Sequence, residues 1–309
     1  MKRISLRKTA LVSLIAGAAT LLTGTVVADS EVKARYRANH VQHQHETSVE
    51  HITSTAQLMG VGAGNVAPTE IWRRLEHGEK VECLNCIPVV SKLLYADNQK
   101  TREIAAWWLR RRILGVFGPG QVYEQTRKTA VDMSASETQR AHAVEALGEF
   151  LHHSGVGPVA QAALDDPSPR VRRSAVWALN RLNTEGPNGE LGQALSDSDV
   201  DVRLEALRGA IRVNVFTSVG SVVSRISDDS PLVRKRAAEV LGAMRAKDAV
   251  VGLVALTTPE AEPDANVRAA AVWALGQIAD PSAKDAVYAA LKDPHPFVRD
   301  AAKIATRRI

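Results

Sequence analysis

One arginine recurs along this chain at a nearly constant interval. Seven arginines are each followed three residues later by an alanine, and they lie 38, 32, 31, 31, 34 and 31 residues apart: Arg102, Arg140, Arg172, Arg203, Arg234, Arg268 and Arg299. Self-similarity at a period of about 20 to 50 residues indicates a solenoid, whose units bury their apolar sides only against their neighbours. The chain is therefore predicted to form an elongated stack of short units.

Each unit has the pattern of two helices. In ALDDPSPRVRRSAVWALNRL a first helix is expected to end at Asp165 and Asp166, and Pro169 falls in the first turn of a second helix that ends at Leu182. Apolar residues then recur at helical spacing and form one stripe for the core, as in Val171, Ala175, Val176 and Leu179. In the last unit Lys303 and Thr306 replace apolar members of the stripe, as expected for a polar cap.

These units resemble HEAT repeats of the short, phycobilin-lyase-like class. The resemblance rests on DPSPRVRRSAVWALNRL, DSPLVRKRAAEVLGAM, DANVRAAAVWALGQI and DPHPFVRDAAKIA, and it covers residues 80–309. It implies an all-α fold, a right-handed α-solenoid of about seven HEAT-like helix pairs, in which the second helices line the concave side. We place this solenoid at residues 68–309, after a disordered N-terminal tail.

The resemblance also implies a structural ladder that links neighbouring units. In such a ladder the aspartate of the turn and the arginine of the second helix act together. This role falls on Asp166, Asp197, Asp228 and Asp293 and on Arg172, Arg203, Arg234, Arg268 and Arg299. Because partly buried ion pairs often serve architecture, we interpret these residues as structural and not as catalytic. The unit that contains Glu262 is three residues longer, which places its insertion in a turn.

Two enzyme types share this repeat, the bilin lyases and the di-iron deoxyhypusine hydroxylase. The hydroxylase resembles a ring of helix pairs whose His-Glu dinucleotides bind iron. Here the one His-Glu pair is His45-Glu46, outside the repeats, and the nearest repeat position has His142 followed by Ala143. The sequence also lacks a P-loop and a dinucleotide-binding fingerprint. We therefore predict no enzyme and no cofactor, and an oxidoreductase function inherited from the family would have no ligands.

The first 28 residues have the pattern of a secretion signal. Lys2, Arg3, Arg7 and Lys8 precede an apolar run from Ala10 to Leu22, and Val26 with Ala28 forms a cleavage site before Asp29. Without this segment 35 basic residues face 34 acidic ones, so the basic composition gives no reason to expect nucleic acid as a partner. An exported, periplasmic protein is predicted, and an uncleaved N-terminal anchor is the alternative.

Residues 29–67 are polar, end in a glycine-rich stretch and are predicted to be a tail and linker. The tail contains four histidines, His40, His43, His45 and His51. Imidazoles at these spacings can bind a transition metal loosely, whereas a solvated polar tail is the simpler interpretation.

Cys83 and Cys86 are the two cysteines of the chain. In an oxidising compartment they are expected to form a disulfide across one helical turn or at a helix start. Free thiols and half of a metal site completed by His77 or the tail histidines are the alternatives. Haem attachment is excluded because Ile87 stands where this motif needs histidine.

Residues one, five and nine positions after each repeated arginine should point away from the buried stripe. On this concave face units three and four contribute a compact basic and aromatic patch with few acids nearby: Arg173, Trp177, Arg181, Arg208 and Arg212. We predict that this patch binds a partner together with Trp107, Arg111 and Trp273 of the same face. Tryptophan and arginine are the residues that most often anchor interfaces. The alternative is that the tryptophan rings fold over adjacent helices and only cover the stack.

Two functions follow from these patterns. The first is a non-catalytic scaffold or adaptor of the bacterial cell envelope that holds an acidic or extended segment of a protein partner. The second is a metal- or redox-linked accessory of an electron-transfer complex, which would rest on the cysteine pair and the histidine cluster. A metal analysis with a thiol count would separate them.

Overall fold

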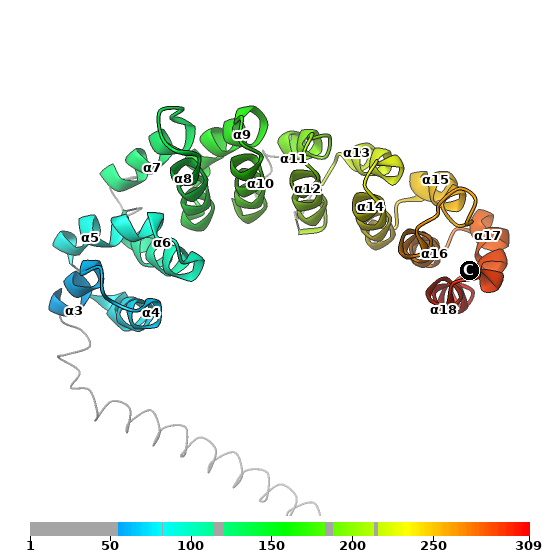
Figure 1. Ribbon diagram of the computed structural model, residues 1–309, viewed down its shortest axis with the longest axis horizontal. Helices are drawn as coiled ribbons and strands as arrows, with labels where there is room; N and C mark the ends of the chain where they lie inside the picture. Colours follow the sequence, from blue (N-terminus) through cyan, green and yellow to red (C-terminus); the bar gives the residue numbers. More distant parts are fainter. Residues whose placement is uncertain (1–54, 82, 114–119, 183–187, 213–215) are drawn as a thin grey trace, which may run out of the picture.

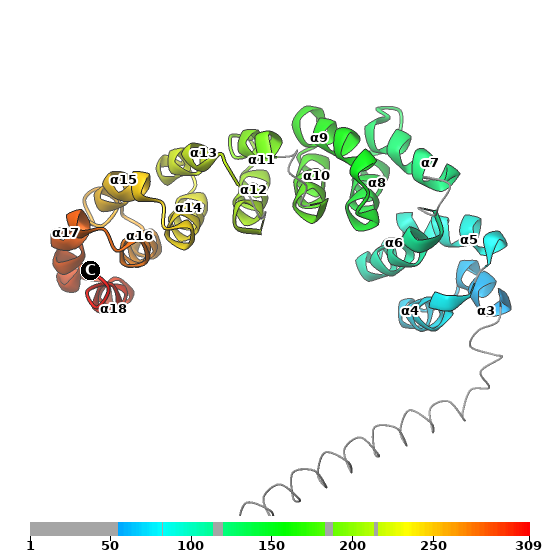
Figure 2. The same ribbon diagram turned by 180° about the vertical axis from the view of Figure 1, so that it is seen from behind.

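The computed structural model describes residues 55–81, 83–113, 120–182, 188–212 and 216–309. These residues fold into consecutive helix pairs that follow one another along an arc, with odd-numbered helices on the outer side and even-numbered helices on the inner side (Figures 1 and 2). The predicted all-α solenoid is thereby confirmed. The predicted signal at residues 1–28 and the histidine cluster of the tail lie outside the described residues.

The outer layer consists of short helices. They are α3 (Thr55–Met59), α5 (Ile87–Lys92), α7 (Gln121–Val131), α9 (Val156–Asp165), α11 (Asn188–Ala194), α13 (Val219–Val223), α15 (Val250–Ala255) and α17 (Lys284–Ala289). Three of them are continued by 3₁₀ turns, η4 (Leu93–Tyr95), η6 (Ser224–Ser227) and η9 (Ala290–Lys292). The outer side of each unit therefore bends before the chain turns inward.

The inner layer consists of longer helices. They are α4 (Pro68–His77), α6 (Gln99–Ile113), α8 (Glu137–Phe150), α10 (Pro169–Leu182), α12 (Val200–Arg212), α14 (Pro231–Met244), α16 (Ala265–Ile278) and α18 (Pro296–Ala305). Proline begins α4, α10, α14 and α18, where the missing N–H costs no helical hydrogen bond. Where α16 begins without proline, the carboxylate of Asp264 accepts hydrogen bonds from the N–H groups of Asn266 and Val267.

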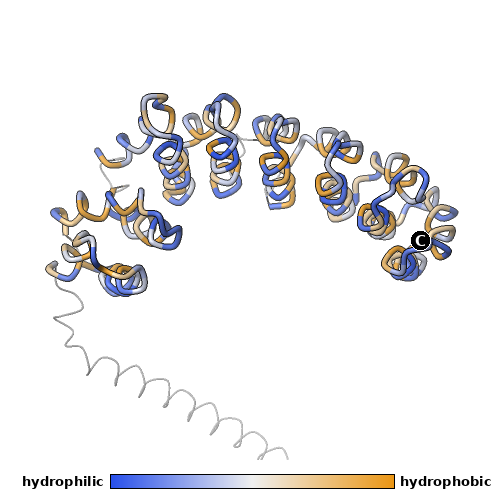
Figure 3. Tube along the Cα trace, viewed as in Figure 1, coloured by the Kyte–Doolittle hydropathy of each residue, from blue (hydrophilic) through white to orange (hydrophobic). Residues whose placement is uncertain are grey.

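The core lies between the two layers and continues from unit to unit. Val171, Ala175, Val176 and Leu179 of α10 are fully buried, and the corresponding residues of α12, α14 and α16 are buried as well. Apolar residues gather where the layers meet, whereas polar residues colour the inner edge of the arc (Figure 3). The apolar stripe that the sequence predicts on each inner helix is therefore buried in the core.

Neighbouring inner helices approach each other at glycines. Gly148, Gly242 and Gly276 each lie eight residues after a repeated arginine and face an alanine of the next inner helix. A Cβ on Gly242 would come within 2.7 Å of the Cα of Ala274. Such a distance leaves no room for any side chain, so backbone meets backbone at these crossings.

The packed chain begins earlier than residue 68, the boundary predicted from the glycine-rich stretch. Helix α3 and the 3₁₀ turn η1 (Gly60–Gly62) precede α4, and Leu58 and Val61 are buried in the core. A Cβ on Gly62 would come within 2.5 Å of the Val89 side chain. This glycine therefore permits close packing against α5 and does not mark a linker.

Candidate functional site on the concave face

The repeated arginines in the middle of the series tie their own turn to the next one, as Arg172 of α10 shows. Its Nη1 donates to the carbonyls of Asp166 and Pro167 at 3.0 and 3.2 Å, in the turn that precedes its own helix. Its Nε and Nη2 donate to both carboxylate oxygens of Asp197 in the next unit, at 2.7 and 2.8 Å. One guanidinium thus closes one turn and holds the next by a bidentate pair.

Pairs between an arginine of one unit and a turn carboxylate of the next continue along the solenoid, although at Arg203 Nη2 alone donates, to Asp228 and Asp229. The pairs are Arg140 with Asp166, Arg172 with Asp197, Arg203 with Asp228, Arg234 with Glu262, and Arg268 with Asp293. The predicted ladder residues are thus placed together, and Arg140 and Glu262 join them. Glu262 stands 28 residues after its arginine, whereas the aspartate follows by 25 or 26 residues in the units without the insertion. The longer glutamate takes over the aspartate's role in the longer unit.

The two ends of the arginine series differ from its middle. Arg102 pairs with Glu145 of α8 at 2.8 Å, in place of a turn aspartate. Arg299 keeps both turn contacts, to the carbonyls of Asp293 and Pro294 at 2.8 Å. Within the described part of the chain no carboxylate of a following unit pairs with it. Arg299 is therefore a ladder arginine with one side only.

Three ladder carboxylates, Asp197, Glu262 and Asp293, have lowered pKa values. Burial alone would raise the pKa of Asp197 and of Asp293, but hydrogen bonds from Arg172 and Arg268 and from backbone N–H groups bring each pKa below its usual value. Glu262 behaves in the same way beside Arg234, and its pKa is also lowered. These groups bind a proton less readily in the folded chain than in the unfolded chain.

These shifts predict an acid limit for the fold. A carboxyl whose pKa is lowered by folding adds stability above its unfolded pKa, and this stability is lost as the pH falls through the folded value. The melting temperature, followed by far-ultraviolet circular dichroism, should therefore fall steeply below about pH 4, near the ordinary pKa of Asp and Glu. A decline already complete between about pH 7 and 5 would contradict this assignment.

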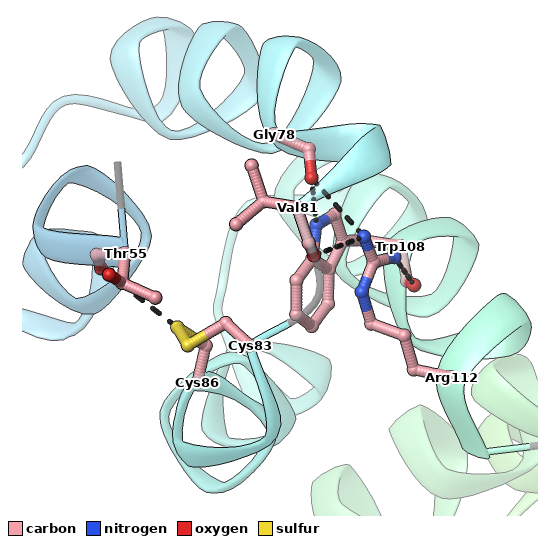
Figure 4. The surroundings of a disulfide bond; sticks show 7 residues. All are labelled: Thr55, Gly78, Val81, Cys83, Cys86, Trp108 and Arg112. Carbon is pink, nitrogen blue, oxygen red and sulfur yellow. Dashed lines mark hydrogen bonds between the residues drawn. A yellow bond between two sulfur atoms is a disulfide. The ribbon is translucent and has the colours of Figure 1, made fainter. Parts of the chain in front are cut away.

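Cys83 and Cys86 form a disulfide in the first part of the solenoid. It lies beside Thr55 of α3, and both cysteines are buried (Figure 4). Next to it, Trp108 donates to the carbonyl of Gly78 at 3.1 Å, and Arg112 stacks on the Trp108 ring. The bond therefore belongs to a packed structural junction between α3, α5 and α6.

The predicted concave residues lie on four inner helices. Trp107 and Arg111 belong to α6, Arg173, Trp177 and Arg181 to α10, Arg208 and Arg212 to α12, and Trp273 to α16. The three tryptophans are half-buried and pack against the core. The rings of Trp177 and Trp273 reach over Gly148 and Gly242 of the preceding inner helix. Because glycine has no side chain, part of each ring packs directly on the backbone where the two inner helices cross.

Part of the predicted patch surrounds a groove of about 520 Å³ on the concave face. Its lining comes from α6, α8, α10 and α12 and their adjoining turns, and includes Arg102, Glu103, Glu145, Glu149, Arg170, Arg173, Ser174, Trp177, Asp199, Asp201, Glu205 and Arg208. Arg173, Trp177 and Arg208 are thus brought together. The other predicted residues do not line this groove: Trp107, Arg111, Arg181, Arg212 and Trp273. Arg111 pairs with Glu79, and Arg181 reaches the groove only through its pair with the lining residue Glu149.

The expectation of few acids near the basic patch is wrong. Arg181 pairs with Glu149 at 2.7 Å, and Arg208 pairs with Glu205 at 2.5 Å. Arg173 lies 3.8 Å from Asp201. Glu149 comes from the neighbouring helix α8, and Glu205 stands three residues before Arg208 on α12. The spacing of Glu205 and Arg208 was the sequence signal for one pair, because residues three apart face each other on a helix.

Two of the four glutamates that line the groove, Glu149 and Glu205, are unusual among the acids of the described residues. Burial raises the pKa of Glu149, and the neighbouring Arg181 offsets this only in part. Burial also raises the pKa of Glu205, against the opposing effect of Arg208. Burial therefore disfavours the charged form of Glu149 and Glu205 by more than their arginines favour it. For Asp197, Glu262 and Asp293 the hydrogen bonds outweigh burial.

A second hollow, of about 480 Å³, lies farther along the concave face. Trp273 lines it together with the exposed Ile211 and Phe297 and with Lys235, Arg236 and Glu239. It is more apolar than the first groove. The concave face therefore offers a charged groove over α6–α12 and an aromatic hollow over α14–α18.

The described residues contain neither a cluster of metal ligands nor a helix that could span a membrane. Nowhere in ranges 55–81, 83–113, 120–182, 188–212 and 216–309 do three or more His, Cys, Asp or Glu side chains gather as metal ligands would. Among the helices described, none has both the length and the apolar character that a bilayer crossing requires.

Comparison with known proteins agrees with this geometry. A family model described as HEAT repeats matches residues 125–187, 189–262 and 259–309. No curated protein matches the sequence.

Three solved structures illustrate the likeness. A crystal structure of importin beta is 13% identical, with 90% of this chain and 44% of that chain covered and a TM-score of 0.59. The Escherichia coli protein YibA is 18% identical, with 83% and 93% covered and a TM-score of 0.52. The CpcE–CpcF phycocyanin lyase of Nostoc sp. PCC7120 is 19% identical, with 71% and 86% covered and a TM-score of 0.39. At these identities the first two support the fold alone.

Proposed function

The chain belongs to the HEAT-repeat family, and from that premise we propose that it is a non-catalytic scaffold or adaptor of the bacterial cell envelope. It binds an acidic or extended segment of a protein partner on its concave face. HEAT solenoids generally bind protein partners, and a long concave surface suits an extended segment. Placement in the periplasm rests on the secretion signal that the sequence predicts at residues 1–28.

One observation carries the choice of surface. Three residues of the predicted patch, Arg173, Trp177 and Arg208, line the groove over α6–α12, and both arginines are exposed. Beside it, the guanidinium of Arg181 lies 5.8 Å from the centre of the half-buried Trp177 ring. Arginine and tryptophan together provide hydrogen-bond donors and a rigid apolar surface, which interfaces use as anchors. Among the described residues, no other cation–π pair includes a residue that lines this groove.

A metal- or redox-linked accessory is the alternative that the cysteine pair suggests. In the structure these cysteines are bonded to each other and buried beneath α3. A redox-active pair needs an accessible sulfur that can be attacked, so this setting favours a structural role for the bond. The scaffold therefore remains the function that the described residues support best.

The proposal predicts that the double substitution Trp177→Ala with Arg181→Ala abolishes partner capture. The purified protein and this variant would each be used to capture proteins from a periplasmic extract, and the captured proteins would be identified and quantified. We expect one or more proteins to be retained by the original chain and lost with the variant, because the anchor of the groove is removed.

The matched control is the double substitution Lys284→Ala with Tyr288→Ala. This pair is also a cation–π pair, with 6.0 Å between Nζ and the ring centre, but it lies on the outer helix α17. It should leave capture unchanged. Equal capture by the original chain and the groove variant would refute binding at this surface.

A further inference from the structure

The crossings between consecutive inner helices share a pair of equivalent positions. Counted from the repeated arginines, the residue eight places on in one helix faces the residue six places on in the next helix. Backbone meets backbone where these residues are glycine and alanine, so the two helices fit closely in one arrangement. Three crossings have this pair: Gly148 with Ala178, Gly242 with Ala274, and Gly276 with Ala305.

Three other crossings lack this pair but are joined by side-chain hydrogen bonds between the helices. Between α10 and α12 the amide of Asn180 takes up the space beside Gly209. Its Nδ2 donates to the carbonyl and to Oε1 of Glu205 at 3.2 and 3.3 Å. Directional bonds of this kind fix the angle between two helices. The bonded pairs are Trp72 with Thr101 between α4 and α6, Arg102 with Glu145 between α6 and α8, and Asn180 with Glu205.

The crossing of α12 and α14 has neither a glycine–alanine pair nor such a bond. Its equivalent positions are occupied by two branched residues, Ile211 and Val240. Val240 is fully buried, whereas Ile211 is 43% exposed. Among the described residues, no hydrogen bond joins a residue of α12 to a residue of α14. Apolar contacts have no preferred direction, so these two helices can slide on each other.

The arginine ladder is also different at this crossing. Arg203 reaches the next turn with Nη2 alone, at 2.8 Å from Oδ1 of Asp228 and 2.6 Å from Oδ1 of Asp229. Its Nε is buried and has no hydrogen-bond partner within the described part of the chain. Oδ2 of Asp228 accepts from Arg225 of its own unit instead, at 3.3 Å. A single nitrogen therefore links these two units, and it lacks the fixed orientation of a bidentate pair.

We propose that the crossing of α12 and α14 is the hinge of this solenoid. The part that ends with α12 and the part that begins with α14 turn relative to each other, by sliding of the two helices at the crossing. Because α12 lies near the middle of the arc, a small turn there displaces both ends (Figure 1). This inference does not depend on the proposed function.

The hinge divides the concave face into two surfaces. The charged groove lies wholly before it, over α6–α12, and keeps its geometry when the hinge turns. The aromatic hollow spans it, since Ile211 belongs to α12 whereas Trp273 and Phe297 belong to α16 and α18. A turn therefore widens or narrows the hollow and changes its distance from the groove. A partner that binds one spacing better than another would shift the chain toward that spacing.

The test measures distances between two nitroxide labels by double electron–electron resonance. Labels at Gln193→Cys in α11 and Val251→Cys in α15 span the hinge and the crossing of α14 with α16. Labels at Ser224→Cys in η6 and Asp285→Cys in α17 span two glycine crossings and are the matched control. All four positions are exposed, and the two native cysteines are bonded to each other and take no label. We expect a broader distance distribution for the hinge pair, and equal widths would overturn the proposal.

Two changes should narrow the hinge distribution to the width of the control. Ile211→Gly with Val240→Ala gives this crossing the glycine–alanine pair that fixes three others. Arg225→Ala releases Oδ2 of Asp228 for Nε of Arg203 and leaves both inner helices unchanged, so it decides the matter even if the first variant does not fold. A width that neither change reduces would show that the motion arises elsewhere and would overturn the hinge.

Discussion

Replacing Arg140 by alanine is expected to lower the free energy of unfolding by about 3–5 kcal/mol, because it leaves a buried carboxylate without its partner. Asp166 has no exposed side-chain surface, and Arg140 has 7%. The guanidinium donates from Nε and Nη2 to both oxygens of Asp166, at 2.6 and 3.0 Å, and from Nη1 to the carbonyl of Ala135 at 2.7 Å. Alanine removes all three bonds and leaves the charge buried.

Arg299 provides the matched control. Its Nη1 also donates to its own turn, to the carbonyls of Asp293 and Pro294, but no carboxylate of a following unit pairs with it among the described residues. Arg299→Ala should therefore cost only about 1 kcal/mol, the ordinary contribution of a few exposed hydrogen bonds. Urea unfolding of both variants measures the difference. Equal losses would show that the carboxylate pair adds nothing beyond closing the turn.

The double variant Arg140→Ala with Asp166→Ala extends this test. Removing both charges takes away the penalty of an unpaired buried carboxylate, so it should recover part of the stability lost in Arg140→Ala. Asp166 also accepts the N–H of Ser168 at 2.9 Å, and that bond is lost in the double variant. Recovery should therefore be incomplete. A double variant less stable than the single one would contradict the assignment.

The fold could be predicted from the sequence because the repeated arginine fixes the register of every unit. Once Arg172 is placed in the first turn of its helix, helical geometry determines that Val171, Ala175 and Val176 face the core. All three are buried. The ladder partner of Arg234 was harder to predict. A turn lengthened by three residues moves the carboxylate and requires the longer side chain of Glu262.

The chemistry of the concave face could be predicted only in part. The positions of Arg173, Trp177 and Arg208 follow from helical spacing, and the structure places them around one groove. The pairing of Arg181 with Glu149 depends on how α8 and α10 are placed side by side, which spacing along one helix does not determine. Charge counted along single helices therefore overestimated how positive this surface is.

The N-terminal boundary was misplaced for a related reason. Glycines between residues 60 and 64 have the composition of a linker, yet Gly62 lies where the side chain of Val89 fills the available space. Composition alone does not distinguish a glycine that allows flexibility from one that allows close packing. The burial of Leu58 and Val61 on either side of Gly60 decides for packing.

The same distinction gives the second large prediction. Gly242→Ala is expected to destabilise the solenoid by about 1–3 kcal/mol, although alanine is the better helix former. The added Cβ would lie 2.7 Å from Cα of Ala274 and 2.9 Å from the ring of Trp273. Since one neighbour is backbone, a rotamer change cannot relieve the contact, and α14 and α16 must separate.

Gly220→Ala is the control for this substitution, since Gly220 lies in the outer helix α13 and a Cβ there would meet no atom within 4 Å. Stability should be unchanged or rise by up to about 1 kcal/mol, the helix propensity difference between glycine and alanine. Both variants would be compared by urea unfolding. If Gly242→Ala behaved like Gly220→Ala, the inner helices would have to be able to move apart without loss of core contacts. The repeat of glycine against alanine at Gly148 with Ala178 and at Gly276 with Ala305 argues that they cannot, because the same close crossing recurs along the inner layer.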